Sequence, residues 1–369
     1  MKIILSATTS WNLFNSRMGL ARALKASGNE VIFLSPHDKY SQYLIDKGFS
    51  WVHFPLKPRG KNIFQELASM LFMISFYRRV KPDLVYHFTP KGVIYGSLAA
   101  KIAGVKVIFN TITGLGYVFS EPSERVLRTL VKIFYPIALF NTIAVFQNSD
   151  DQKLFCEKRI VASDKNFLIR SSGVDMDLFK FSPQVEGKPI VLLSSRFVKE
   201  KGIRYFIEAA RILKTRNINV RLALVGQPEE NQPTSITLTE IEKWVSGGLV
   251  DWWGWHDDME EIYPKAHVVC LPTYYMEGVP KVLIEAAACG RPLIATNVPG
   301  CREIVQNGYN GILVPPKNAL ALADAITKLS KDREMRKRMG RNSRELASIN
   351  FSAEKVIADY FELYEKYRI

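Results

Sequence analysis

The sequence predicts an α/β protein built from two doubly wound halves, and three observations support this. Strand-like apolar segments alternate with helix-like segments along the chain, as in sheets of mainly parallel strands. The alternation restarts after the connector FSPQVEGKP, near residue 181. The length of 369 residues is enough for two domains with separate cores. We therefore expect domains at 1–181 and 182–352, with a final helix at about 353–369 packing back onto the first domain.

In the first half, short apolar segments bounded by turn residues indicate strands. These expected strands are 2–7, 30–36, 83–88, 105–111 and 141–149. Helices are expected at 17–28, which ends at a glycine, and at 93–104, and the segment 8–19 includes the loop after the first strand.

The second half repeats the pattern. Its expected strands are 189–197, 220–226, 250–255, 268–273 and 291–297, with a helix at 204–216. The last helix, 353–367, has apolar residues at a spacing near 3.6. In doubly wound sheets, ligands bind at the carboxyl ends of the strands, so candidate residues are sought there.

Composition limits the class of protein. An apolar content of 47% and a charged content of 23% are those of a folded domain. No stretch of about 20 apolar residues exists, and the N-terminal apolar run is too short for a secretory signal, so neither a membrane span nor a leader is expected. The cysteines lack paired metal spacing, which indicates reduced thiols in a cytosol-like compartment. They are Cys156, Cys270, Cys289 and Cys301.

Positive charge is concentrated in the first half. Residues 1–181 hold 24 Lys/Arg and 13 Asp/Glu, a net charge of +11, and residues 182–369 hold 26 and 23, a net of +3; together they give +14. Such a surplus favours an anionic membrane or nucleic acid as partner. The chain has no nucleic-acid-binding motif, so we expect a membrane surface and no nucleic acid.

Two glutamates with seven residues between them stand out in TYYMEGVPKVLIEAAACGRP. The segment follows an apolar strand, and Pro280 fits the first position of a helix, whose free N–H groups suit a phosphate or a polar sugar. Glu277 lies at the turn and Glu285 about two helical turns further on. Carboxylates are unfavourable beside a diphosphate, so the pair suggests hydroxyl groups to bind, as in a nucleotide-sugar. The alternative is a surface helix with two solvated glutamates.

Three further loops follow strands of this half and should open on the same edge. SSRFVKEKG carries Arg196 and Lys201, which suit phosphate oxygens or belong to a solvated basic loop. In LVGQ, Gly226 would let the backbone approach a ligand closely. WWGWHDD offers Trp255 and His256 to a nucleobase, although a packed tryptophan cluster explains the motif equally well.

Together these motifs resemble the family-four retaining glycosyltransferases of the GT-B fold, in which two Rossmann-like domains face a central cleft. The motifs are SSRFVKEKG, GWHDD, YYMEGVPKVLIEAAACGRPLIATNVPG and NGILVPP, within 187–330, followed more weakly by SSGVDMDLFKF at 171–181. The resemblance implies that Arg196 and Lys201 grip the donor diphosphate and that Glu285 holds the ribose hydroxyls. It implies that Glu277 contacts the donor sugar, near the backbone of Gly278, Val279, Pro280 and Lys281. His267 stands where relatives often have Asp, and we expect it to be structural.

The first half resembles transferases that extend polyprenyl-diphosphate-linked glycans in bacterial envelope synthesis. The motifs are TSWNLFNSR, HFTPKGVIYGSLAAK, NTITGLGYVF and FQNSDD, although the frequent Gly-Gly loop after the first strand is missing. His87 and Lys91 are candidates for a catalytic or phosphate-binding role, with a core histidine as the alternative for His87. Candidate acceptor contacts are Asn12, Asn15, Arg17, Gly114 and Gly116, the two glycines being otherwise turn residues.

Two basic and apolar segments, 57–81 and 125–140, are candidates for lipid contact. Each is equally consistent with a helix that covers the sheet, and the acceptor's own diphosphate would also favour basic residues. The charge therefore does not separate membrane from substrate.

These resemblances imply a retaining glycosyltransferase that moves a hexose or N-acetylhexosamine from a UDP-sugar to a polyprenyl-diphosphate-linked saccharide at the cytoplasmic membrane face. Retention is expected by a front-face path or by double displacement. Neither a cofactor nor a metal is expected, because no dense Asp/Glu/His cluster occurs. The alternatives are a transferase of the same fold with a soluble sugar or other glycolipid acceptor, and a non-catalytic nucleotide-sugar-binding scaffold.

Overall fold

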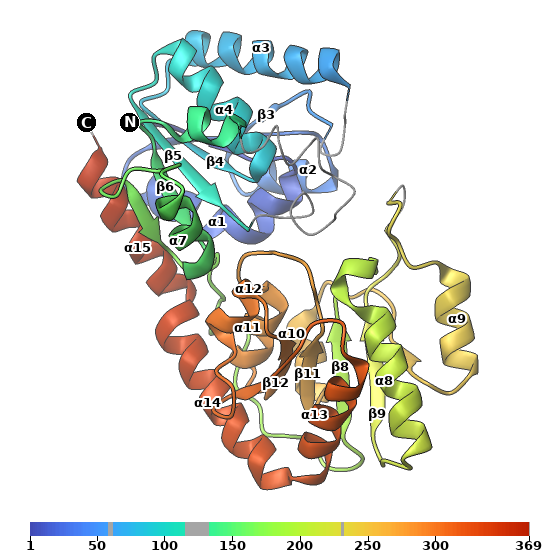
Figure 1. Cartoon of the computed structure of the whole chain (residues 1–369). Coiled ribbons are helices and arrows are strands. Elements are labelled where there is room, and N and C mark those ends of the chain that lie inside the picture. The colour runs from blue at the N-terminus through green and yellow to red at the C-terminus, as the bar shows by residue number, and fades with distance from the viewer. Residues whose placement is uncertain (58–61, 115–132, 230–231, 369) are drawn as a thin grey trace. The chain divides into compact units, whose positions relative to one another are not determined.

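The chain forms two compact units (Figure 1). The computed structural model describes residues 1–57, 62–114, 133–229 and 232–368. Unit 1 comprises Met1–Gly173 and Ala353–Ile369, and unit 2 comprises Val174–Ser352. Residues 174–181, expected in the first domain, belong to unit 2, where the Arg344 guanidinium donates hydrogen bonds to the carbonyls of Met176 and Phe179.

Unit 1 contains a seven-stranded parallel sheet in the order β3-β2-β1-β4-β5-β6-β7. The strands are β1 (Lys2–Ser6), β2 (Glu30–Ser35), β3 (Ser50–His53), β4 (Leu84–Phe88), β5 (Val107–Ile112), β6 (Ile143–Phe146) and β7 (Asn166–Leu168). The helices with described bounds are α1 (Ser10–Ala26), α2 (Lys39–Asp46), α3 (Ile63–Val80), α4 (Pro90–Ala103), α7 (Ser149–Glu157) and α15 (Ala353–Tyr367). α1 and α15 pack on one face of the sheet, and α3 and α4 pack on the other.

Helix α1 begins earlier than expected, so most of the expected loop at 8–19 is helical. Thr9 is the N-cap, and its hydroxyl accepts a hydrogen bond from the Asn12 amide at 3.1 Å. The buried side chains of Leu13 and Met18 then give this segment an apolar face against the sheet. The first-half candidates Asn12 and Asn15 therefore lie on a helix.

Unit 2 contains a six-stranded sheet in the order β10-β9-β8-β11-β12-β13, again with parallel pairing. Its strands are β8 (Ile190–Ser194), β9 (Arg221–Val225), β10 (Asp251–Trp252), β11 (Val268–Leu271), β12 (Leu293–Thr296) and β13 (Gly311–Val314). Its α-helices are α8 (Ile203–Thr215), α9 (Leu238–Ser246), α10 (Met259–Ile262), α11 (Lys281–Ala288), α12 (Pro299–Ile304), α13 (Ala319–Lys331) and α14 (Arg333–Phe351). α8, α9 and α13 cover one face, whereas α10, α11, α12 and α14 cover the other.

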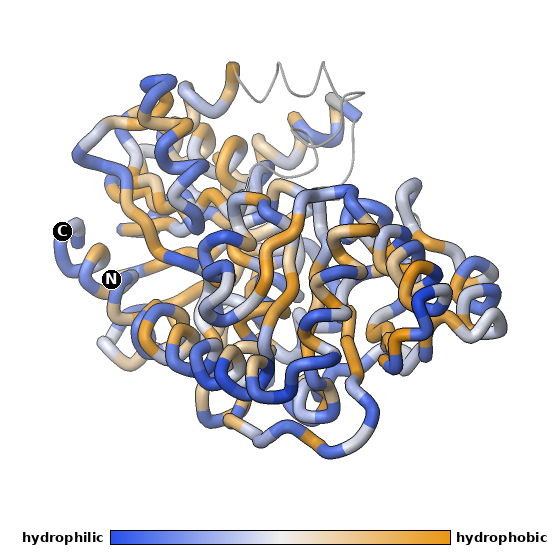
Figure 2. Tube along the Cα trace, turned by 60° about the horizontal axis from the view of Figure 1, so that its bottom comes forward, coloured by the Kyte–Doolittle hydropathy of each residue, from blue (hydrophilic) through white to orange (hydrophobic). Residues whose placement is uncertain are grey.

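Both sheets are buried between helix layers, which explains their nearly continuous apolar strands. Most strand residues are hydrophobic, whereas the helices combine hydrophobic and hydrophilic residues (Figure 2). The edge strands β3 and β10 are the more polar ones. In each sheet the strand order reverses once, between β1 and β4 in unit 1 and between β8 and β11 in unit 2. Loops that diverge at such a reversal leave a crevice at the carboxyl edge, where ligands bind in this class of fold.

Within the part of the chain that the structure describes, no helix is long and apolar enough to cross a membrane.

Candidate active site

The carboxyl edge of the unit 2 sheet brings together most residues expected to bind the donor. Arg196 and Lys201 follow β8, Glu277 follows β11, and Glu285 lies on α11, which the same loop leads into. β8 and β11 are the neighbours between which the strand order reverses. The basic residues and the glutamates thus come from the two sides of the crevice.

Lys201 and Glu277 form the central ion pair. The Lys201 Nζ atom lies 2.8 Å from each Glu277 carboxylate oxygen. The two side chains are 12% and 17% exposed, so their attraction is screened less than that of a surface pair. An ammonium group has three N–H donors, and two of them point at Glu277, which leaves one for another acceptor.

Glycines hold the two loops in this position. A Cβ on Gly202 would lie 2.0 Å from the Pro272 carbonyl oxygen, and the φ of Gly202 is +77°. A third loop, which follows β12, meets the β11 loop in the same way, because a Cβ on Gly300 in the first turn of α12 would lie 1.9 Å from the Gly278 carbonyl oxygen. No side chain fits at either position without moving backbone, so both glycines are needed for the loops to meet.

The buried hydroxyl of Thr273 links the same two loops. Its single proton is shared between the Glu200 carbonyl at 3.1 Å and Glu277 Oε1 at 3.3 Å, and it accepts a hydrogen bond from the Tyr275 amide at 3.1 Å. The Thr273 carbonyl in turn accepts a hydrogen bond from the Thr296 hydroxyl. The carboxylate of Glu277 is therefore fixed from two directions.

Glu285 is buried on α11, with one protein donor near each carboxylate oxygen. Tyr263 donates its hydroxyl proton to Oε2 at 3.1 Å, and Lys281 Nζ lies 3.6 Å from Oε1. Burial raises the pKa of Glu285, while Lys281 and the Tyr263 hydroxyl act in the opposite direction. Each oxygen keeps a lone pair that could accept a ligand hydroxyl.

The turn before α11 differs slightly from expectation. Pro280 is the N-cap with ψ of 118°, and the helix begins at Lys281, one residue later than expected. Pro280 makes no side-chain hydrogen bond to this end, and the Leu283 amide donates to the Pro280 carbonyl at 3.1 Å. The positive end of the helix dipole still favours an anion or a polar sugar here. Gly278 and the buried Val279 form the turn.

Arg196 is paired away from the glutamates of the turn. Its Nη1 atom lies 3.0 and 3.1 Å from the two carboxylate oxygens of Glu229. Arg196 is nevertheless close enough to Glu277 to be affected by its charge. Because 46% of its side chain is exposed, it can reach an anion in the crevice by exchanging this partner.

The space beside Gly226 in which a side chain would lie is filled by the protein itself. A Cβ there would lie 2.1 Å from the Ser195 carbonyl oxygen, so no ligand fits on that side. Trp255 is 43% exposed, and its indole N–H donates to Asp257 at 3.2 Å. His256 contacts Asp258 through Nδ1 at 2.9 Å and the Trp253 carbonyl through Nε2 at 3.0 Å. Among Gly226, Trp255 and His256, Trp255 has the exposed ring surface on which a nucleobase can stack.

His267 has a structural place, as expected. It is buried, and its Nδ1 accepts a hydrogen bond from the Ile190 amide at 3.0 Å, while its own amide donates to the Ile190 carbonyl at 2.9 Å. These bonds tie the start of β8 to the start of β11.

In unit 1, His87 lies in the core and not at a substrate surface. It has no exposed surface, its Nε2 lies 3.1 Å from the Tyr77 hydroxyl, and its Nδ1 lies 3.1 Å from Asn110 Oδ1. A Cβ on Gly96 would meet its ring at 2.4 Å. Burial lowers the pKa of His87 to about 4. These contacts favour the core-histidine alternative over a catalytic one.

Lys91 and Arg17 are also engaged within unit 1. Lys91 lies in the first turn of α4, and its Nζ is 2.6 Å from Glu66. Arg17 is buried, with its guanidinium carbon 4.2 Å from the centre of the Phe88 ring. A direct acceptor contact by Arg17 is therefore not supported, because its side chain does not reach the surface.

The remaining acceptor-side candidates have different outcomes. Asn12 is half-buried, and Asn15 donates to the Trp11 carbonyl at 3.1 Å. Gly114 has a φ of +109°, which suits the turn alternative. Gly116 lies outside the described residues, as does the 125–132 part of the candidate lipid-contact segment 125–140.

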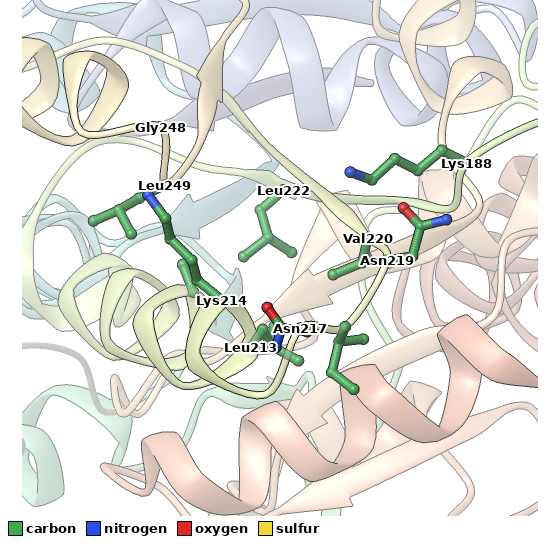
Figure 3. Close-up of a pocket in the computed structure, with 11 residues that line it drawn as sticks. Lys188, Leu213, Lys214, Asn217, Asn219, Val220, Leu222, Gly248 and Leu249 are labelled. Carbon is green, nitrogen blue, oxygen red and sulfur yellow. The ribbon is translucent and has the colours of Figure 1, made fainter.

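A cavity of about 360 Å³ lies at the other edge of the unit 2 sheet (Figure 3). Lys188, Asn219 and Leu222 line it from the starts of β8 and β9, and Lys214 from the end of α8. Segments that precede strands form the amino edge, so this cavity is separate from the donor crevice.

The sequence reasoning missed four contributors to the site. Glu229 and Tyr263 carry no local motif, because their partners lie 33 and 22 positions away. Thr273 and Gly300 each follow a strand end, and this common position was the signal that could have identified them.

Comparison with known proteins agrees with this geometry. The family model for group 1 glycosyl transferases matches residues 175–346, and the model for glycosyl transferase 4-like proteins matches residues 2–148. The solved structure of Anabaena HepE in complex with UDP-glucose has a TM-score of 0.81 at 19% identity. It covers 99% of this chain and 100% of its own.

Two curated relatives extend over most of the chain. The N,N'-diacetylbacillosaminyl-diphospho-undecaprenol alpha-1,3-N-acetylgalactosaminyltransferase of Campylobacter jejuni is 26% identical, over 96% of each chain. The UDP-Gal:alpha-D-GlcNAc-diphosphoundecaprenol alpha-1,3-galactosyltransferase of Escherichia coli is 23% identical, over 84% of this chain and 82% of its own. With both halves matched and the fold shared, the chain belongs to the family-four glycosyltransferases of the GT-B fold.

Proposed function

We propose that this chain transfers a hexose or N-acetylhexosamine from a UDP-sugar to a polyprenyl-diphosphate-linked saccharide, with retention of the anomeric configuration. Two relatives that align over most of the chain are named for transfer of N-acetylgalactosamine or galactose to an undecaprenyl-diphosphate-linked sugar. The names of both relatives specify alpha linkages. Retention would give the same linkage, because the sugar of a UDP-sugar is usually alpha-linked.

The observation that carries the proposal is the buried Lys201–Glu277 pair beside the start of α11. A cation and a helix N-terminus suit the donor diphosphate, and a fixed carboxylate suits the hydroxyl groups of a sugar. Glu285 adds a second carboxylate on the same helix, buried and with spare lone pairs for the ribose.

During transfer, the acceptor hydroxyl oxygen forms a bond to the anomeric carbon while the bond from that carbon to the diphosphate oxygen breaks. In a front-face path, the hydroxyl proton passes to the departing oxygen on the same side of the sugar. Negative charge grows on the leaving diphosphate, and Lys201 and Arg196 stabilise it electrostatically. Lys201 offers its third N–H for this purpose, and Arg196 offers the donors not used by Glu229.

We also propose that unit 1 contacts an anionic membrane at the cytoplasmic face through α3. Phe64, Leu67 and Leu71 are spaced three and four residues apart, and they are 81%, 47% and 55% exposed. That spacing places them on one side of the helix. Arg78 and Arg79 are exposed in its last turn. Apolar and basic side chains together suit the interface of an anionic bilayer.

The test is a panel of UDP-sugars offered with two acceptors, a short polyprenyl-diphosphate-linked saccharide and the same saccharide free. We expect product mass to increase by one sugar residue only with the lipid-diphosphate acceptor and one or two donors, and NMR of the product to show an alpha linkage. Transfer to the free saccharide at an equal rate would contradict the acceptor assignment. Absence of transfer with every donor would contradict the proposal as a whole.

A further inference from the structure

Tyr263 makes a contact in the site that the roles above do not use. It lies in the segment after α10, has no exposed surface, and packs its ring 6.2 Å from that of Phe179. A buried phenol needs a hydrogen-bond partner, and Tyr263 finds one in Glu285 Oε2 at 3.1 Å.

The Ser194 hydroxyl, at the end of β8, does not orient Tyr263, because it donates to the Met259 Sδ atom at 4.0 Å. Tyr263 is instead held by its complete burial and by its packing against Phe179.

The effect on Glu285 is to fix the rotation of its carboxylate. Lys281 lies on the Oε1 side and Tyr263 on the Oε2 side, so neither oxygen is free to turn. Lys281 is on the same helix and one third exposed, whereas Tyr263 is rigid in the core. The fixed direction comes from Tyr263.

We infer that Tyr263 is a positioning residue that sets the ribose specificity of the donor site through Glu285. The inference rests on the proposed function, in which Glu285 holds the ribose hydroxyls. A carboxylate held at a fixed angle discriminates a nucleotide with both ribose hydroxyls from one that lacks a hydroxyl, because a missing hydroxyl leaves a buried acceptor unpaired.

The charged and titratable groups near Glu285 make a second readout available. They are Lys281, Tyr263, Glu260 and Cys289. Burial raises the pKa of Glu285, and the Tyr263 hydroxyl lowers it. Loss of that hydroxyl should raise the pKa of Glu285 further. On acidification, UDP binding should therefore begin to weaken at a higher pH in a variant without the hydroxyl than in the wild type.

The experiment compares UDP with 2′-deoxy-UDP and 3′-deoxy-UDP by calorimetric titration of the full chain. We expect the wild-type protein to prefer UDP over at least one deoxy analogue by about tenfold or more. In Tyr263→Phe we expect the affinity for UDP to fall about tenfold and the affinity for that analogue to change less than about twofold.

Tyr86→Phe is the matched control, because the Tyr86 hydroxyl is buried in unit 1 without a hydrogen-bond partner. It should keep the wild-type preference. Equal loss of affinity for UDP and the deoxy analogues in Tyr263→Phe would overturn the inference, since a general disturbance of the fold has that effect. An unchanged preference in Tyr263→Phe would overturn it as well. Failure of the wild-type protein to bind UDP would instead contradict the proposed function.

Discussion

Lys201 and Glu277 form an ion pair in a largely buried position, so each side chain holds the other in place. Removing one partner of such a pair leaves the second charge unpaired. The role proposed for Lys201 in the reaction adds to this, because the same ammonium also faces the leaving diphosphate.

We therefore expect Lys201→Ala to lower kcat by about 10²- to 10³-fold, since one electrostatic donor to the developing charge is lost. Steady-state kinetics at saturating donor measures this. Lys199→Ala, two residues away on the same turn, is the control and should stay within about twofold. Turnover near the wild-type value in Lys201→Ala would remove this residue from the mechanism.

His87 gives a prediction about stability instead of catalysis. Its pKa is about 4 in the folded protein because of burial, against about 6.5 in the unfolded chain. The unfolded state therefore binds more protons between these values, and stability is lost as the pH falls through that window. The loss amounts to about 2 kcal/mol between pH 7 and pH 5.

Urea unfolding at the two pH values tests this, with His87→Gln as the comparison, because glutamine keeps polar atoms near Tyr77 and Asn110 but does not titrate. We expect the variant to lose about 2 kcal/mol less than the wild type on acidification. The same acid sensitivity in both proteins would mean that His87 is not the titrating group.

At the scale of elements, α3 combines an exposed apolar side with a basic end. Phe64→Ser/Leu71→Ser should weaken binding to vesicles that contain anionic lipid by about tenfold or more, because two large apolar side chains no longer leave water on binding. Vesicle flotation measures this. Leu320→Ser, at a similarly exposed leucine on α13, is the matched control and should bind like the wild type. Equal binding by all three proteins would contradict the membrane role of α3.

Strands and helices were predicted correctly where neighbouring residues in the sequence carry the pattern, and incorrectly where the pattern depends on more distant packing. The apolar strand segments at 2–7 and 268–273 gave β1 and β11 within two residues, since a buried parallel strand is apolar along its whole length. The start of α1 was not predicted, because Trp11 and Asn15 on its outer side interrupt the sequence pattern of the apolar face that includes Leu13. The N-cap Thr9 was the available signal.

The same distinction holds for the site. The convergence of Lys201 and Glu277 could be predicted because parallel strands end at one edge of a sheet. The pairing of Arg196 with Glu229 could not, because it depends on how a long loop folds back after β9. Burial of His87 depends on packing of α3 and α4 over the sheet, including the close approach of Gly96.

At the scale of the whole molecule, the two units have separate cores, and the C-terminal helix α15 belongs to the first. Tyr360 on α15 is buried in the unit 1 core and lies 3.2 Å from the Thr111 hydroxyl. Tyr360→Ala should lower the stability of unit 1 by about 3–5 kcal/mol, as expected for removal of a large buried ring.

Hydrogen exchange measured by mass spectrometry separates the two units. We expect faster exchange in peptides from Met1–Gly173 of Tyr360→Ala and unchanged exchange in peptides from Val174–Ser352. Tyr43→Ala, at a half-exposed tyrosine of unit 1, is the control and should change exchange much less. Faster exchange throughout both units would contradict the independence of their cores.

The division of unit 1 between the two ends of the sequence has a consequence for biosynthesis. As the chain leaves the ribosome, Val174–Ser352 is available in full before Ala353–Tyr367 has emerged. We expect unit 2 to fold first during translation. The unit 1 sheet stays uncovered on the face that α15 packs against until that helix has emerged. A nascent chain that stops short of Tyr360 would therefore contain a folded unit 2 and an incomplete unit 1, whose exposed apolar surface chaperones would bind.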